Sequence, residues 1–124
     1  MTTIIEVIHR INTIKPNNYA QAEKIKWLSS LDGIVKKDII DKHEGGDNVK
    51  FDGYKENIDL NQELLVPAPY DDIYLFWLEA QINYWNGEID KYDNSMEMFN
   101  QAFSNYAKYY KQTHMPKAKN FKYF

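Results

Sequence analysis

Three histidines are the first residues to consider for chemistry, because imidazole acts both as a general base and as a metal ligand. His9, His43 and His114 lie in three separate segments of the chain. None has a second histidine at the helical spacing that places two ligands on one face. His43 and His114 fall at the expected C-terminal ends of helices, where a protonated imidazole is favoured. The spacing predicts exposed or helix-capping histidines and no metal site.

Acidic side chains are a second source of chemistry. The segment 44–63 carries five carboxylates that offer oxygen ligands: Glu44, Asp47, Asp52, Glu56 and Asp59. It lacks the alternating ligands, the Gly at the sixth place and the Glu at the twelfth that a calcium loop requires. Asp71 and Asp72 are adjacent, so on a helix they point apart, and the helix dipole explains acids at a helix start. We therefore expect a solvated loop, and no acid pair for hydrolysis.

Nucleophiles and phosphate-binding loops give no stronger signal. The chain has no cysteine, which excludes thiolate nucleophiles, disulfides and cysteine zinc sites. Gly45–Gly46 follows an expected helix, whereas a phosphate loop precedes one. The serines have no nucleophile-elbow context. These patterns predict that the protein is not an enzyme and binds no cofactor.

Composition limits the remaining classes of protein. With 124 residues, 44% hydrophobic and 27% charged, the chain is typical of one globular domain. A net charge of −3 gives no overall attraction for nucleic acid or anionic lipid. The apolar runs are far shorter than the ~20 residues of a membrane span, so we expect no membrane contact. Ten Tyr, six Phe and three Trp exceed what a small core requires, which favours assembly with other chains.

The N-terminal half predicts two helices. Thr3 and Glu6 have the spacing of a capping box, and the isoleucines that follow predict a helix over about 3–14. A second helix is expected from about 19 to 43, with Asn18 as its N-cap. Its apolar face comprises Ala22, Ile25, Leu28, Leu31, Val35 and Ile39. Asp32–Gly33 interrupts this pattern, which predicts a kink or a close helix contact.

The centre of the chain, 44–69, predicts an irregular loop and strap. The apolar period is lost from 44 to 63, where at most a short hairpin is expected, with 49–51 paired to 54–56 around Asp52–Gly53. The two prolines of Pro67–Ala68–Pro69 predict an extended strap that buries the three aliphatic residues before it. This strap is expected to cross a pair of helices.

The C-terminal half predicts a long antiparallel helix pair over about 71–85 and 88–113. The second of these helices carries an aromatic seam at spacings of three and four: Tyr92, Met96, Phe99, Phe103, Tyr106 and Tyr110. The predicted fold is therefore all-α, a small bundle of about four helices. It forms one domain over 1–116, followed by a basic and aromatic tail, 117–124.

Two strings carry a resemblance to a known family: LLVPAPY at 64–70 and YWNGE at 84–88. Together with the wider segments 19–44 and 63–116, they resemble the head–tail connector, or adaptor, proteins of tailed phages and prophages of Gram-positive bacteria. The resemblance implies an α-helical protein without catalytic residues that forms a ring under the portal. Such a ring extends the DNA conduit and offers a platform for the next stopper or tail protein.

The resemblance also implies partners and locations. The partners are a portal protein, a stopper or tail-completion protein and further copies of the chain, and DNA passes only through the lumen. Assembly takes place in the bacterial host cytoplasm, and the finished ring lies at the head–tail junction of the virion. The alternative is a small phage regulatory or DNA-binding protein that uses 20–43 as a helix-turn-helix with its turn at Asp32–Gly33. This alternative is weakened because the lysines of that segment are interspersed with acids.

Two sets of residues are predicted to contact partners. Segment 70–113 has three lysines against seven acids, so we expect the acids to line the lumen and let DNA slide: Asp71, Asp72, Glu79, Glu88, Asp90, Asp93 and Glu97. The tail is expected to anchor on the portal or on a neighbouring subunit through three lysines and three aromatic residues: Lys117, Lys119, Phe121, Lys122, Tyr123 and Phe124.

Overall fold

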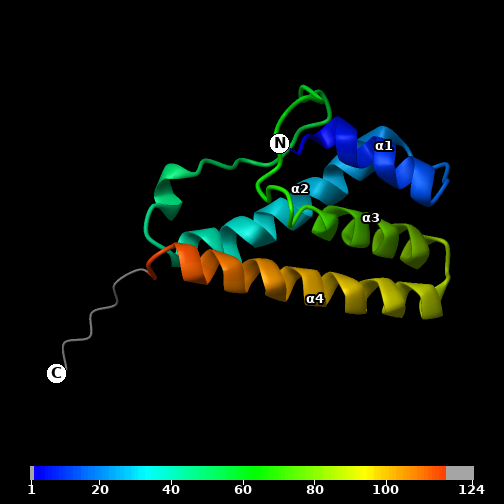
Figure 1. The fold of residues 1–124 in the computed structure, drawn as a ribbon. Helices are drawn as coiled ribbons and strands as arrows, with labels where there is room; N and C mark the ends of the chain where they lie inside the picture. Colours follow the sequence, from blue (N-terminus) through cyan, green and yellow to red (C-terminus); the bar gives the residue numbers. More distant parts are fainter. Residues whose placement is uncertain (1, 117–124) are drawn as a thin grey trace.

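Four α-helices order the chain between residues 2 and 116, the part that the computed structural model describes. They are α1 (Ile4–Ile14), α2 (Gln21–Asp38), α3 (Asp72–Trp85) and α4 (Ile89–Thr113) (Figure 1). Two short 3₁₀ turns, η1 (Ile40–Lys42) and η2 (Gly46–Asn48), follow α2. Within the described residues β pairing is limited to two isolated bridges. The predicted all-α fold is therefore confirmed.

The predicted N-cap residue is correct for α1 and wrong for α2. The Thr3 hydroxyl accepts a hydrogen bond from the Glu6 N–H at 3.4 Å and donates to the Glu6 carboxylate at 3.1 Å, so the expected cap is present. The prediction of Asn18 as the cap of α2 is wrong, because Ala20 holds that position. The side chain of Asn17 accepts from the Tyr19 N–H at 3.1 Å and turns the chain before the helix begins.

Helix α2 is continuous through Asp32–Gly33 and ends at Asp38, short of the predicted His43. A Cβ added at Gly33 would lie 3.9 Å from the Phe51 ring, an ordinary contact distance with a loop side chain, so no close helix contact requires this glycine. The turn that the helix-turn-helix alternative needs is therefore absent from α2.

Helices α3 and α4 form the predicted antiparallel pair (Figure 1). Phe99, Tyr106 and Tyr110 of the seam are buried, and Met96 and Phe103 are partly buried against the same core. Tyr92 is partly exposed, and its ring contacts Tyr84 near the α3–α4 turn. The Trp77 ring packs against Phe99 with centroids 5.0 Å apart. One core cluster joins all four helices to the strap residues Leu64 and Val66, which are buried as predicted. The third aliphatic residue, Leu65, is only partly buried against the same core.

The predicted hairpin around Asp52–Gly53 is not formed, because the backbone of the loop bonds to other elements. The N–H groups of Ile4 and Ile5, which α1 leaves unpaired, donate to loop carbonyls of Gln62 and Leu60 at 3.1 and 2.9 Å. The Tyr54 N–H donates to the Ser29 hydroxyl of α2 at 2.9 Å. The loop therefore serves as the N-terminal cap of α1 and as a cover for α2.

The last described residues return to the end of α2. The Glu44 N–H donates to the Met115 carbonyl at 2.7 Å, and His43 and Pro116 form one of the isolated bridges. Pro116 therefore lies at the end of α4 far from the α3–α4 turn (Figure 1). None of the helices described between residues 2 and 116 combines the length and apolar character needed to cross a membrane.

Candidate functional site

A buried carboxylate holds the strap in place. Asp32 of α2 is 0% exposed. It accepts hydrogen bonds from the Tyr54 hydroxyl, from the Tyr74 hydroxyl at 2.7 Å and from the Leu65 N–H at 3.1 Å. The Tyr74 hydroxyl in turn accepts from the Val66 N–H at 2.7 Å. One side chain thus joins α2, the loop, the strap and α3, and we call this group of residues the Asp32 clamp.

The electrostatics of the clamp are those of a desolvated anion. Burial raises the pKa of Asp32, and the hydrogen bonds from Tyr54, Tyr74 and Leu65 act against that rise. Burial also raises the pKa of Tyr54 and of Tyr74, and the nearby Asp32 charge adds to both shifts. The phenols therefore stay protonated and donate. With three donors aimed at it and no exposure to solvent, the carboxylate is suited to positioning the strap.

The sequence contained a signal for this clamp. Asp32 falls within the apolar face of α2, next to Leu31 and before Val35. An unpaired carboxylate in such a position is costly, so its presence indicates buried donors. The kink or close helix contact predicted at Asp32–Gly33 is wrong, because α2 is continuous there and the carboxylate instead accepts hydrogen bonds from buried donors.

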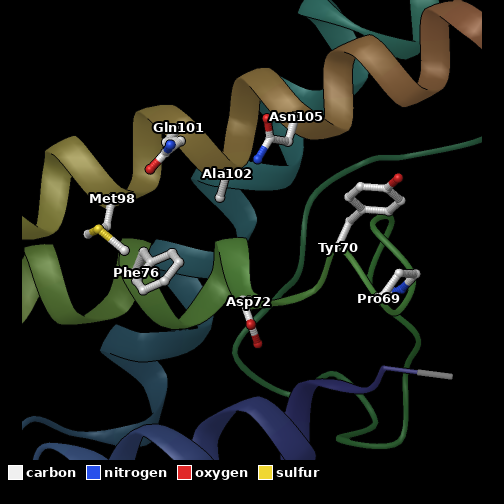
Figure 2. A pocket seen from close by; sticks show the side chains of 8 residues that line it. All are labelled: Pro69, Tyr70, Asp72, Phe76, Met98, Gln101, Ala102 and Asn105. Carbon is white, nitrogen blue, oxygen red and sulfur yellow. The ribbon is translucent and has the colours of Figure 1, made fainter.

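The strap leads into a groove between α3 and α4. Figure 2 shows Pro69 of the strap, Tyr70 directly after it, Asp72 and Phe76 of α3, and four residues of α4 around this groove. The volume of the groove is about 330 Å³. The α4 residues are Met98, Gln101, Ala102 and Asn105. Tyr70 stacks on Tyr109 with ring centroids 4.7 Å apart. The clamp therefore fixes one wall of this groove through the strap.

The seven predicted lumen acids lie in two groups. On the side of α3 that faces α1, Asp72 lies 3.6 Å from the Arg10 guanidinium, and Glu79 lines the same depression. Asp71 accepts from the Thr2 hydroxyl at 2.7 Å. The remaining four belong to the start of α4 and the turn before it: Glu88, Asp90, Asp93 and Glu97.

The acids of α4 share its outward face. Asp90, Asp93 and Glu97 are spaced by three and four residues, are exposed, and lie opposite the aromatic seam. Glu88 contacts Lys91 at 2.8 Å and Lys15 at 3.5 Å. The hydrogen bond from Lys91, helped by Asn86, lowers the pKa of Glu88 to about 2. Glu88 is therefore already paired within the chain.

The α3–α4 turn exposes an apolar surface that the sequence reading did not single out. Tyr84, Trp85 and Ile89 are 49%, 61% and 54% exposed. The Tyr84 ring contacts those of Trp85 and Tyr92 with centroids 5.2 and 5.4 Å apart. We call Tyr84, Trp85, Ile89 and Tyr92 the end patch. It includes the start of the YWNGE string, whose residue types favour protein contacts.

His43 and His114 contact the carbonyls at the C-terminal ends of helices, as their positions predicted. The Nδ1 atom of His43 lies 2.7 Å from the Ile39 carbonyl, and that of His114 lies 3.2 Å from the Tyr110 carbonyl. Both rings pack on Tyr110, with centroids 5.1 and 3.7 Å away. Between residues 2 and 116 no group of three or more His, Asp or Glu side chains is placed to hold a metal ion. The predicted tail contacts, 117–124, lie outside the described residues.

The fold and these features define a small all-α protein with an internally clamped strap and an exposed aromatic end. No protein-family model, curated protein or solved structure matches the chain.

Proposed function

We propose that the protein is a structural connector that forms a ring under the portal of a tailed phage. In this role it extends the DNA conduit and offers a platform for a stopper or tail-completion protein. It assembles in the host cytoplasm and ends at the head–tail junction. Its partners are the portal, the next tail component and its own copies, and DNA passes through without being bound.

One observation carries the proposal. The two strings on which the resemblance rests, 64–70 and 84–88, fall on the strap held by the Asp32 clamp and on the α3–α4 turn. The first is held by hydrogen bonds to Asp32 and Tyr74, and the second includes Trp85, which is 61% exposed. A large aromatic side chain left in water at a turn is typical of a surface that a partner covers.

The alternative, a DNA-binding regulator, has less support. It requires a turn at Asp32–Gly33, where α2 is continuous and Asp32 is buried in the clamp. A side chain so enclosed is unable to reach a base edge or a phosphate. We therefore retain the regulator only as an outcome to be excluded by experiment.

Deletion of the coding sequence from the phage or prophage genome tests the proposal. We expect DNA-filled heads without tails, loss of infectious particles, and recovery when the chain is supplied in trans. Flanking genes for portal, capsid and tail proteins would agree with this role. Normal particle yields after deletion would refute it.

A titration of the purified chain with random duplex DNA at low salt separates the two classes. A connector forms no tight complex, whereas a regulator forms a salt-sensitive complex in the micromolar range. A salt-sensitive complex, together with altered phage gene expression and normal heads in the deletion strain, would favour the regulator.

A further inference from the structure

We propose that the C-terminal tail, 117–124, of one copy binds the end patch of the next copy. This inference rests on the proposed ring and names the contact that builds it. The patch offers exposed apolar surface on Tyr84, Trp85 and Ile89. The tail, KAKNFKYF, offers three aromatic residues for that surface and three lysines. Aromatic side chains joined to cations are typical anchors of protein interfaces.

The length of the tail determines whether it can contact the end patch of its own chain or only that of a neighbouring copy. Helix α4 has 25 residues, so its two ends are about 37 Å apart. The end patch lies at the start of α4. The described chain stops at Pro116, which pairs with His43 just beyond the C-terminal end of α4 (Figure 1). Eight extended residues span at most about 29 Å. The tail therefore falls short of the patch on its own chain.

Charge supports the same pairing. Asp93 lies four residues after Ile89 and so neighbours it on the surface of α4, and Asp90 lies three residues before Asp93. Both are exposed, and neither is among the ion pairs found within residues 2–116. The lysines of an incoming tail would meet these carboxylates beside the apolar contact. Charge complementarity of this kind fixes register and speeds association.

Such a contact has the symmetry of a ring. The tail follows α4 along the chain and the patch lies at the start of that helix, so they are different surfaces and each copy donates one and receives the other. Head-to-tail contacts of this type close into a ring when the rotation between copies allows it. The same pairing also permits a closed dimer in which two copies exchange tails, and linked trimers and longer species distinguish the ring from that dimer.

Disulfide trapping tests the inference cleanly, because the chain has no cysteine of its own. One variant carries Asn120→Cys in the tail, and a second carries Ile89→Cys in the patch. After mixing under mild oxidation, we expect the mixed disulfide dimer to form about tenfold faster than with an Ile34→Cys variant, a preference equivalent to about 1.4 kcal/mol. Ile34 is a matched control because it is an exposed isoleucine, on α2.

The double variant Asn120→Cys/Ile89→Cys gives the second readout. We expect linked dimers, trimers and longer species, because the tail cannot close on its own chain. A monomer closed by an internal disulfide would overturn the inference, as would equal rates for the Ile89→Cys and Ile34→Cys partners. Cross-linking of the tail cysteine to a different protein in assembled particles, with no link to Ile89→Cys, would assign the tail to that protein instead.

Charge reversal separates a specific contact from general stickiness. Changing Asp90 and Asp93 to Lys should slow the cross-link to the control rate, and changing the three tail lysines to Glu in the partner should restore it. Failure of the rescue would overturn the pairing. Because these measurements use purified chains, a negative result leaves the deletion phenotype, and with it the proposed function, to stand or fall separately.

Discussion

Asp32 shows how one residue orders a segment without secondary structure of its own. The Leu64 N–H donates to the Thr2 carbonyl at 2.9 Å. The next two N–H groups of the strap, those of Leu65 and Val66, donate to the side chains of Asp32 and Tyr74. Both lead to the same carboxylate. A charged group is costly in the core, and three donors offset that cost. These hydrogen bonds therefore also position Pro69 and Tyr70, which form one wall of the groove in Figure 2.

Replacing Asp32 by Ala should lower the free energy of unfolding by about 2–3 kcal/mol, because buried donors lose their acceptor. Tyr54→Phe should cost about 1.5–2 kcal/mol, since it removes one of the three hydrogen bonds to a charged acceptor. Urea unfolding followed by circular dichroism measures both. Ser30→Ala, an exposed change on the same helix, serves as the control and should stay within about 0.5 kcal/mol of the parent. A similarly small effect of Asp32→Ala would contradict the clamp.

The pH dependence of stability should carry the signature of Asp32. Burial raises its pKa in the folded chain above the ordinary 3.8. Between 3.8 and that raised value, the folded chain holds a proton that the unfolded chain has released. The stability of the parent relative to Asp32→Asn should therefore fall as pH rises through this window and level off above it. Urea midpoints of both proteins across acidic pH measure the difference. A relative stability that rises with pH instead would mean that the hydrogen bonds outweigh burial.

At the scale of elements, the spacing of apolar residues predicted those features that depend on one buried face of a helix. The boundaries of α3 and α4, the seam from Tyr92 to Tyr110 and the buried strap all follow from apolar spacing and proline. The predictions are wrong where hydrogen bonds between residues distant in sequence determine the local structure. The loop caps α1 through Leu60 and Gln62, and no local pattern indicates that these carbonyls lie beside residues far earlier in the chain. For the same reason, the clamp joins residues as far as 42 positions apart and escaped a local reading.

The α3–α4 pair permits a matched test of the seam. Phe99 is 7% exposed and packs on Trp77, whereas its neighbour Met98 is 42% exposed at the groove. Phe99→Ala should lower the free energy of unfolding by about 3–5 kcal/mol, because a large buried ring leaves a cavity. Met98→Ala should cost less than about 1 kcal/mol, because little of its surface leaves the core. A loss below about 1 kcal/mol for Phe99 would mean that the seam faces a partner.

At the scale of the whole molecule, the described residues already form one core, so the tail is expected to contribute little to folding. Removing 117–124 should leave the free energy of unfolding within about 1 kcal/mol of the parent, because the core cluster is formed within residues 2–116. Incorporation into heads should be lost, because the tail is the proposed link between copies. Thermal unfolding and particle yield measure the two effects. Unfolding of the shortened chain, or normal infectious particles, would reject this division of roles.

The predicted lumen wall and the proposed tail contact give Asp90 and Asp93 two different roles, lining the DNA conduit or binding the lysines of a neighbouring tail. If Asp93 lines the conduit, Asp93→Lys places a cation beside the DNA, and the resulting delay in DNA passage should persist whatever the tail carries. If Asp93 receives the lysines of a neighbour's tail, the same change repels that tail, and Lys-to-Glu changes at 117, 119 and 122 should restore particle yield. Yields of the single and combined variants, with the same change at Glu97 as the control one turn further along α4, separate the two roles. We expect rescue for Asp93 and none for Glu97, because Asp93 borders Ile89 whereas Glu97 lies eight residues away from it. A yield that the tail changes fail to restore at Asp93 would return this residue to the lumen wall.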